Sequence, residues 1–214
     1  MGLFITFEGG EGCGKSTQAR ILWKRLCAQG LPAILLYEPG GTALGDRIKR
    51  LVKRRNIYPL SPQAELFLFV ASRAQLVAEA ILPALQEGKI VICDRFAYST
   101  LVYQGYGRGL DLPATAAMNK LATQGLKPDL AILLDISPEQ GLSRKQNSKD
   151  RFELEDLSFH QRVREGYLKT VDSEPDRWLL IDATLPRTTV SQIIWRKVGQ
   201  LYQQASEPAT GTHG

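Results

Sequence analysis

Residues 9–16 of the chain read GGEGCGKS and follow directly on the apolar run Leu3 to Phe7. The segment fits the pattern G-x-x-x-x-G-K-[ST], in which glycines let backbone N–H groups turn inward around phosphate oxygens. It predicts a strand, a tight loop and a helix, Ser16 to Gln29, whose N-terminal partial positive charge adds to the anion site. The fold must therefore contain a strand–loop–helix unit, and we expect the loop to hold the phosphates of a nucleotide.

Four further apolar runs alternate with amphipathic stretches along the chain. The runs are Ala33 to Tyr37, Ile90 to Cys93, Leu130 to Leu134 and Trp178 to Ile181, and the helical patterns cover Leu44 to Lys53, Pro62 to Glu87, Ala114 to Thr123, Leu154 to Val171 and Thr188 to Gln204. Such near-continuous apolar runs are typical of strands buried on both faces of a parallel sheet. The alternation predicts an α/β fold with a doubly wound parallel sheet of about five strands. The polar residues after each strand are then candidates for ligand binding.

The length of 214 residues and the 43% hydrophobic content suit a single domain with a sizeable core. We expect this domain to cover residues 1–205, with a mobile lid segment near 142–153. The final stretch, 206–214, is rich in Pro, Thr and Gly and is predicted to be a disordered tail.

Charge and cysteine usage indicate the partners and the compartment. The net charge of +5 comes from basic residues dispersed among acidic ones, so we expect small phosphorylated ligands and no nucleic acid. The apolar stretches read as too short to span a bilayer, which predicts no membrane partner. The three cysteines are odd in number, lack metal-ligand spacing and come without a secretory signal, so a reduced, cytoplasmic compartment is expected.

Two large classes of nucleotide-binding protein fit the chain poorly. A regulatory GTPase needs an N-K-x-D or T-K-x-D segment, and an ATP-driven motor commonly carries adjacent Asp-Glu after a hydrophobic run; neither pattern occurs. The later strands are followed instead by residues able to bind a second small substrate. These are Glu38 to Thr42, Asp94 to Thr100, and a polar segment with Arg144, Lys145, Lys149 and Arg151.

At these residues the chain resembles bacterial thymidylate kinases, nucleoside monophosphate kinases that convert dTMP to dTDP with ATP. The match covers nearly the whole chain: F-E-G-x-E-G-x-G-K-S-T, E-P-G-G-T, F-V-A-S-R, D-R-F with S-T-x-x-Y-Q-G, K-P-D-L, D-R-F-E and I-D-A-T. The resemblance implies the P-loop nucleoside monophosphate kinase type of fold, ATP as donor, Mg²⁺ and a homodimer, for which the long apolar helix Pro62 to Glu87 is a candidate interface. The residues expected to bind ATP are Gly9, Gly10, Glu11, Gly12, Cys13, Gly14, Lys15, Ser16 and Thr17.

The resemblance also implies an acceptor site for dTMP. Its expected members are Glu11, Glu38, Lys49, Phe69, Arg73, Arg95, Ser99, Thr100, Tyr103 and Gln104. Phe69 is expected to stack on the base, and Arg73, four residues later on the same helix face, to donate near the pyrimidine edge. Tyr103 resembles the ring that crowds the sugar 2′ position, and Glu11 the acid near the 3′-hydroxyl. Lys49 stands where relatives often carry Arg, which has a planar fork that Lys lacks.

The residues expected to carry out the phosphoryl transfer are Lys15, Asp94, Arg95, Arg144 and Arg151. Lys15 is predicted to reach the β and γ phosphates, the Ser16 hydroxyl to ligate Mg²⁺, and Asp94 to hold the same ion through water. Arg95 is expected to grip the acceptor phosphate. One subgroup of the family carries an arginine in the loop where this chain has Gly12, so the lid is expected to supply that arginine. No residue is needed as a general base, because the accepting phosphate oxygen is already anionic.

Two alternatives remain at this point. A kinase of the same fold could act on dUMP, on a broader set of monophosphates or on a nucleoside. A P-loop regulator that binds nucleotide and DNA without fast turnover would also account for the positive charge.

Overall fold

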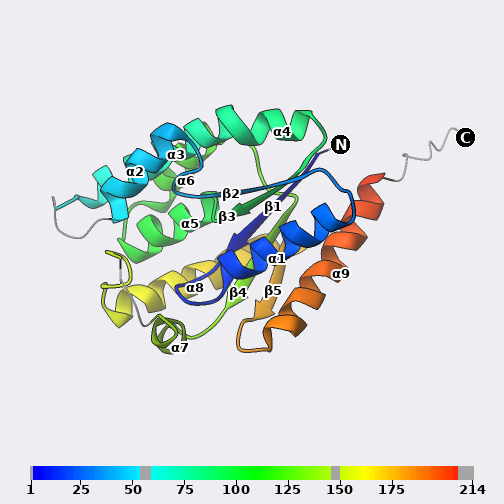
Figure 1. Ribbon diagram of the computed structural model, residues 1–214. Helices are drawn as coiled ribbons and strands as arrows, with labels where there is room; N and C mark the ends of the chain where they lie inside the picture. Colours follow the sequence, from blue (N-terminus) through cyan, green and yellow to red (C-terminus); the bar gives the residue numbers. More distant parts are fainter. Residues whose placement is uncertain (1, 54–58, 146–149, 207–214) are drawn as a thin grey trace, which may run out of the picture.

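The computed structural model describes residues 2–53, 59–145 and 150–206, and a parallel sheet of five strands forms its centre (Figure 1). The strands are β1 Leu3–Glu8, β2 Ala33–Tyr37, β3 Ile90–Asp94, β4 Leu130–Asp135 and β5 Trp178–Asp182. Their order is β2-β3-β1-β4-β5, and every neighbouring pair is parallel. The predicted sheet is confirmed, and each apolar run forms a strand that ends within one residue of the expected position.

Helices cover both faces of the sheet because the side chains of the central strands alternate between two apolar layers. Leu3, Ile5 and Phe7 of β1 pack toward α1 (Lys15–Ala28) and α9 (Arg187–Ser206), which lie against each other. Phe4 points to the opposite layer. Burial on both sides explains why the central strands are apolar at nearly every position.

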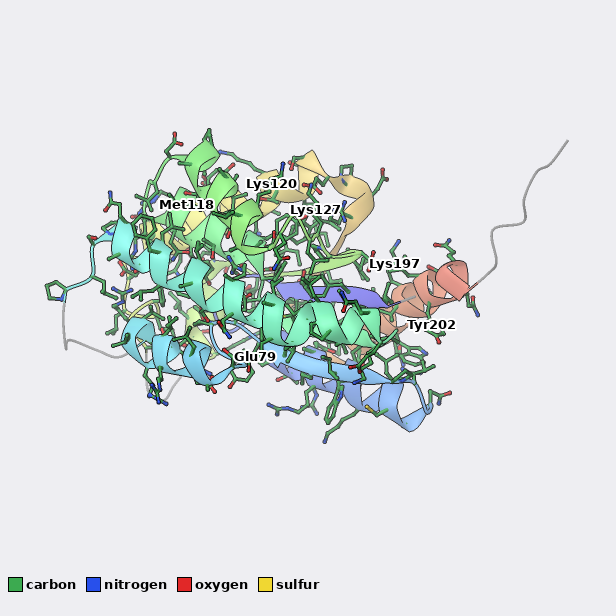
Figure 2. All side chains as sticks on the ribbon, turned by 90° about the horizontal axis from the view of Figure 1, so that it is seen from above. Glu79, Met118, Lys120, Lys127, Lys197 and Tyr202 are labelled. Atoms are coloured by element: carbon green, nitrogen blue, oxygen red, sulfur yellow. The ribbon has the colours of Figure 1, made fainter. Side chains whose placement is uncertain are left out.

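The opposite face carries one long continuous helical segment (Figure 2). It consists of α3 Pro62–Leu76, the π-helical turn η1 Val77–Ile81 and α4 Leu82–Gln86, with α2 (Ala43–Lys53) packed against α3. Pro83 lacks an N–H group, and its ring would clash with a carbonyl one turn back, so the wider π turn lets the helix continue through it. The single helix predicted over Pro62 to Glu87 is confirmed as continuous helix.

By length and composition this helix is also apolar enough to cross a membrane, with a mean hydropathy of 1.5 over its most apolar window. The expectation that every apolar stretch is too short for a bilayer is therefore wrong for Pro62–Gln86. One such helix is weak evidence for a membrane span. Here it lies along a sheet face, and a third of its most apolar window, 33%, is buried inside the protein.

Two helical segments lie outside the expected patterns. The first is α5 Ala97–Thr100 continuing into the π-helical η2 Leu101–Gly107, and the second is α7 Pro138–Ser143. Residues 97–107 are buried or half-buried throughout, so the segment lacks the polar face that an amphipathic pattern needs. The remaining elements are α6 Leu112–Ala122, α8 Leu157–Ser173 and the short η3 Pro175–Arg177. Helix α8 starts three residues later than expected, because Asp156 caps it by accepting from Phe159 N at 2.7 Å.

The expected lid, residues 142–153, begins inside α7. Residues 146–149, which include Lys149, lie outside the described part of the chain, and so do residues 207–214 of the expected tail. Residue 206 ends α9.

Candidate active site

The loop between β1 and α1 uses left-handed backbone at three glycines. The φ angles of Gly9, Gly12 and Gly14 are 136°, 68° and 96°, a region that other residues rarely adopt. This backbone turns the loop toward the N-terminus of α1, where unpaired N–H groups favour an anion. Lys15 is the first residue of the helix, and its Nζ donates to the carbonyl of Gly10 at 2.6 Å, so its charge lies over the loop.

A cleft of about 530 Å³ opens at the carboxyl end of the sheet, beside this loop. Its lining brings together residues from the loop, from α1 and α2, from the ends of β2 and β3, and from the start of the lid. The predicted site residues among them are Glu11, Gly12, Gly14, Lys15, Ser16, Thr17, Glu38, Lys49, Asp94, Arg95 and Arg144. Chain segments that lie far apart in the sequence therefore form one site, and cations dominate it.

The two residues expected to hold a cation lie in contact. Ser16 Oγ donates to Asp94 Oδ2, while Asp94 Oδ1 is buried without a hydrogen-bond partner. Both residues line the cleft. A hydroxyl beside a carboxylate with an unsatisfied oxygen fits Mg²⁺, which usually takes one or two protein oxygens and completes its shell with water and phosphate. Within the described ranges, no group of three or more His, Cys, Asp or Glu forms a denser metal site.

Arg95 occupies a left-handed backbone conformation, with a φ of 74°. Such a conformation is strained for a residue with a side chain and persists where the surroundings fix it. Two hydrogen bonds hold this turn: Arg95 N donates to Phe7 O at 2.9 Å, and Phe96 N donates to Glu8 Oε1 at 2.9 Å. The turn directs the Arg95 guanidinium back across the sheet end to the loop carbonyl of Gly9, at 3.1 Å.

Glu11, Arg95 and Tyr103 form one cluster in the cleft. Glu11 Oε1 accepts from Arg95 at 2.7 Å and from the Tyr103 hydroxyl at 2.8 Å. Burial of Glu11 opposes its ionisation, but Arg95, Lys15, the Tyr103 hydroxyl and Lys145 outweigh it and hold the pKa of Glu11 well below its usual range. The carboxylate is therefore charged at neutral pH. The electrostatic cost of an acid beside phosphates is offset by these three cations.

A second, narrower cavity of about 40 Å³ adjoins the cleft and shares Glu11, Lys53 and Arg95 with it. Besides Glu11 and Arg95, four more predicted acceptor residues line it: Phe69, Ser99, Tyr103 and Gln104. Phe152 forms another part of its wall, with ring centroids 5.8 Å from Phe69 and 6.0 Å from Tyr103. Ligand pockets usually measure roughly 300 to 1,000 Å³, so a ring that stacks on Phe69 requires the Phe152 side to open.

Arg73 and Thr100 lie behind this cavity, outside its lining. The Arg73 side chain is 1% exposed, and its N–H groups all donate to protein atoms. It binds both oxygens of Glu38, Thr100 Oγ1 at 2.9 Å, Asn119 Oδ1 at 2.6 Å and the Phe96 carbonyl at 3.0 Å. Donation from Arg73 to a base edge stays a prediction, and it requires one of these bonds to be released.

Lys49 lies in the main cleft with Glu38, and its Nζ sits 4.2 Å from the centroid of the Tyr37 ring. Burial and the neighbouring Lys53 lower the pKa of Lys49. Burial and Lys53 both disfavour the charged form of Lys49, and an anionic ligand near the ammonium group would stabilise it.

The two lid arginines occupy different places. Arg144 lines the main cleft and donates to the carbonyl of Ala183 at 3.1 Å. Lys145 joins it there and pairs with Glu153 at 2.5 Å and with Glu11 at 3.9 Å. Arg151 lies outside the cleft lining and donates to Glu65 of α3. The structure thus brings Arg144 to the phosphate-binding loop and keeps Arg151 on the side of the narrow cavity.

Gly12 touches the lid helix α7 directly. A Cβ at Gly12 would lie 1.9 Å from the Gly141 carbonyl, and a Cβ at Gly141 would lie 2.3 Å from the Glu11 carbonyl. Only two glycines allow the backbones to approach so closely. An arginine at position 12 has no room in this arrangement, and the supply of an arginine from the lid stays a prediction.

Three residues near the site escaped the sequence reasoning. Glu8 is fully buried and accepts from Ser99 Oγ at 2.6 Å and from the Tyr167 hydroxyl at 3.2 Å. Burial raises the pKa of Glu8 to about 7, against the opposing effects of Ser99, Arg95, Phe96 N and Arg73. Glu65 and Phe152 are the other two. The sequence indicated these residues only through nearby motifs. Glu8 lies in F-E-G and Phe152 in D-R-F-E, and Glu65 lies shortly before F-V-A-S-R.

Comparison with known proteins adds independent findings. The model of the thymidylate kinase family matches residues 7–194. A thymidylate kinase of Dehalococcoides mccartyi is 53% identical over 199 residues, which cover 92% of this chain and 96% of the relative. One from Caldanaerobacter subterraneus is 45% identical over 206 residues, which cover 95% and 98%.

Among solved structures, the crystal structure of thymidylate kinase from Ehrlichia chaffeensis superposes with a TM-score of 0.78. The sequences are 30% identical, and the match covers 92% of this chain and 98% of the other. Family model, full-length relatives and fold agree with the motif order and with the cationic cleft at the sheet end. The chain therefore belongs to the thymidylate kinase family and is a kinase, an enzyme that transfers phosphoryl groups.

Proposed function

We propose that this enzyme transfers the γ-phosphoryl group of ATP to dTMP in an in-line reaction that yields dTDP, a precursor of dTTP. The observation that carries the proposal is the shared wall of two cavities. The phosphate-binding cleft and the narrow aromatic cavity meet at Glu11 and Arg95, so an acceptor monophosphate bound in one reaches the donor phosphates in the other. Relatives that are named thymidylate kinases along their whole length support dTMP as this acceptor.

On the donor side, the loop from Gly9 to Thr17 would bind the ATP phosphates, with Lys15 reaching the β and γ positions. A hollow of about 310 Å³ next to the loop is lined by Cys13, Thr17, Arg144 and residues near the start of α9, and it offers space for the rest of the donor nucleotide. Ser16 and Asp94 would hold Mg²⁺, which supplies positive charge to the phosphates when it is bound.

On the acceptor side, Phe69 would stack on the thymine ring, and Ser99 and Gln104 would contact its edge. Tyr103 and Glu11, which are hydrogen-bonded to each other, would lie next to the sugar. Arg95 would bind the acceptor phosphate, because its guanidinium lies on the wall common to both cavities. Glu38, Lys49, Arg73 and Thr100 complete the predicted set, the last two by supporting the site from behind.

Arg144 is the lid arginine best placed to stabilise the transferring group. It lies in the cleft next to the loop, whereas Arg151 is engaged by Glu65. Arg151 remains a candidate in a more closed state of the lid. Lid closure would exclude water and limit hydrolysis of ATP.

The expected assembly is a homodimer with the long helical segment Pro62–Gln86 as its interface, and we add to it the neighbouring α6, which lies on the same side in Figure 2. Phe67 on α3 is 55% exposed, Leu121 at the end of α6 is 81% exposed, and Ala71 and Ala78 continue an apolar stripe along the long helix. A contiguous apolar face on a soluble enzyme is typical of a protein interface. The second subunit of this homodimer would also cover the helix Pro62–Gln86, which is apolar enough to cross a membrane. We propose a cytoplasmic enzyme with no membrane or nucleic acid partner, on the strength of its cysteine usage and of basic residues dispersed among acidic ones.

The decisive experiment is a coupled assay of ADP release across a panel of monophosphates. We expect ADP formation that depends on dTMP and is much slower with UMP. Equal rates for UMP and dTMP would refute the assignment to deoxythymidylate and favour a kinase of broader specificity. A P-loop regulator would show no turnover that depends on dTMP.

A further inference from the structure

Glu65 is a carboxylate on α3 that is 1% exposed and lies outside the lining of both cavities. Three side chains from two other segments donate to it. Gln104 Nε2 donates to Oε1 at 2.8 Å, Arg108 donates at 3.1 and 3.2 Å, and Arg151 donates to Oε2. Glu65 can take part in all of these hydrogen bonds only as the acceptor, because an ionised carboxylate accepts hydrogen bonds and donates none.

This acceptor-only partner fixes the direction of the Gln104 amide. The two ends of a glutamine amide have similar shapes, and their assignment rests on their neighbours. Beside Glu65, the end in contact has to be the NH₂ group, because a carbonyl there would face a carboxylate oxygen. The carbonyl Oε1 of Gln104 is therefore the atom left for a ligand, and Gln104 lines the narrow cavity next to Phe69.

We propose that Glu65 is a positioning residue that selects the acceptor base through Gln104. With its NH₂ group held by Glu65, Gln104 offers a hydrogen-bond acceptor to the base. Thymine and uracil present an N–H at ring position 3, whereas cytosine presents an unprotonated nitrogen there. Glu65 thus makes the cavity accept the first two bases and reject the third. The inference rests on the proposed function, since it assumes a pyrimidine on Phe69.

The arginines around Glu65 hold its carboxylate in the orientation that fixes the Gln104 amide. Arg108 lies over the rings of Phe152 and Phe159, with its guanidinium carbon 5.7 and 4.8 Å from their centroids, and it also pairs with Glu155 at 2.7 Å. Arg108 donates to both oxygens of Glu65, sharing Oε1 with Gln104 and Oε2 with Arg151, so the carboxylate is held at both oxygens. Rejection through a buried, wrongly oriented hydrogen-bonding group is strong, because the mismatch leaves two acceptors facing each other without water.

The test compares dUMP with dCMP as acceptors, because these substrates differ only at the base edge that Gln104 would read. The variant Glu65→Gln keeps the size of the side chain but can donate an N–H, which lets the Gln104 amide reverse. We expect the ratio of kcat/KM for dUMP to that for dCMP to fall at least tenfold in E65Q. In Glu65→Asp, which remains acceptor-only, the ratio should stay within about threefold of the wild-type value.

Arg108→Lys serves as the matched control, because lysine keeps a cation that can donate to Glu65 and leaves Glu65 facing Gln104; its ratio should equal that of the wild type. An unchanged ratio in E65Q would overturn the inference. If the wild-type enzyme releases no ADP with dTMP or dUMP, the proposed function itself fails, which is a separate outcome.

Should E65Q not fold, a crystal structure of the wild-type enzyme with dUMP decides the matter. We expect the Gln104 amide to bridge Glu65 and position 3 of the base. A Gln104 side chain that leaves Glu65, or that does not touch the base, would overturn the inference.

Discussion

The proposed donor and acceptor halves of the site differ in their chemistry. The donor half consists of a glycine loop, a helix N-terminus and cations that face an open cleft of about 530 Å³. The acceptor half is surrounded by buried polar groups that are already bonded to one another: Arg73 to Glu38, Arg108 and Arg151 to Glu65, and the hydroxyls of Ser99 and Tyr167 to Glu8.

The contrast follows from what each half has to recognise. Phosphates carry charge in every nucleotide, so flexible cations and backbone N–H groups suffice to hold them. A base is distinguished from its analogues by one or two polar atoms, which demands side chains fixed in orientation before the ligand arrives. Changes in the acceptor half should therefore cost stability, and changes in the donor half should cost turnover.

The largest effect on stability is expected from Arg73→Ala. The substitution leaves the Glu38 carboxylate buried without its partner, and burial already raises the pKa of Glu38 despite the opposing effect of Arg73. Removing one member of a buried ion pair costs about 3 to 5 kcal/mol. Urea unfolding at pH 7 measures this loss. Arg73→Lys is the control: it keeps the charge, and its loss should be smaller. A loss under about 1 kcal/mol in R73A would contradict the fixed acceptor half.

The next effect concerns the donor half and compares the two lid arginines. We expect Arg144→Ala to lower kcat by about 10² to 10³, because Arg144 lies in the cleft next to the loop. Arg151→Ala should lower kcat less than tenfold, because its guanidinium is engaged by Glu65. Steady-state kinetics with saturating ATP and dTMP measure both changes. A larger loss in R151A than in R144A would mean that the lid rearranges for catalysis and that Arg151 is the arginine that reaches the phosphates.

The donor half was the easier half to predict from the sequence. The contact of Ser16 with Asp94, the place of Lys15 over the loop and the strand ends all lie where the motif and the apolar runs indicated. Each of these features depends either on residues close in the sequence or on the order of the strands. The loop motif and the apolar runs indicate both. The resemblance added Arg144, and the structure brings it to the same cleft.

The acceptor half resisted sequence reasoning for a physical reason. The spacing of four positions between Phe69 and Arg73 suggested a shared helix face. Phe69 lines the cavity, but the Arg73 guanidinium is bound to Glu38, 35 positions away. A buried charged residue is recognised by its partners, and these partners come from distant segments of the chain. Glu65 meets Gln104 and Arg151 across 39 and 86 positions, and no periodicity reports such pairings.

The smallest effect concerns the pH dependence of stability, through Glu8. Its pKa is about 7 in the folded protein against an ordinary value of 4.5. Below pH 4.5 the group carries a proton in both states, and its protonated form suits the buried site. Between pH 4.5 and 7 the unfolded chain has lost the proton while the folded protein keeps it, so stability falls as the pH rises. Above pH 7 the folded protein also carries the buried charge, and the loss is complete.

Glu8→Gln removes this dependence and keeps both contacts: its carbonyl oxygen can accept from Phe96 N, and its NH₂ group can donate to the Ser99 hydroxyl oxygen. The free energy of unfolding of the wild type, relative to E8Q, should therefore decrease by about 2 to 3 kcal/mol from pH 4.5 to pH 8, which follows from 1.36 kcal/mol per pKa unit. Urea unfolding of both proteins across this range measures the difference. Glu38 also has a raised pKa, but it is present in both proteins and cancels. Parallel curves for the two proteins would show that Glu8 is ionised throughout, held by Arg95 and Arg73, and that the acceptor half tolerates a fully charged network.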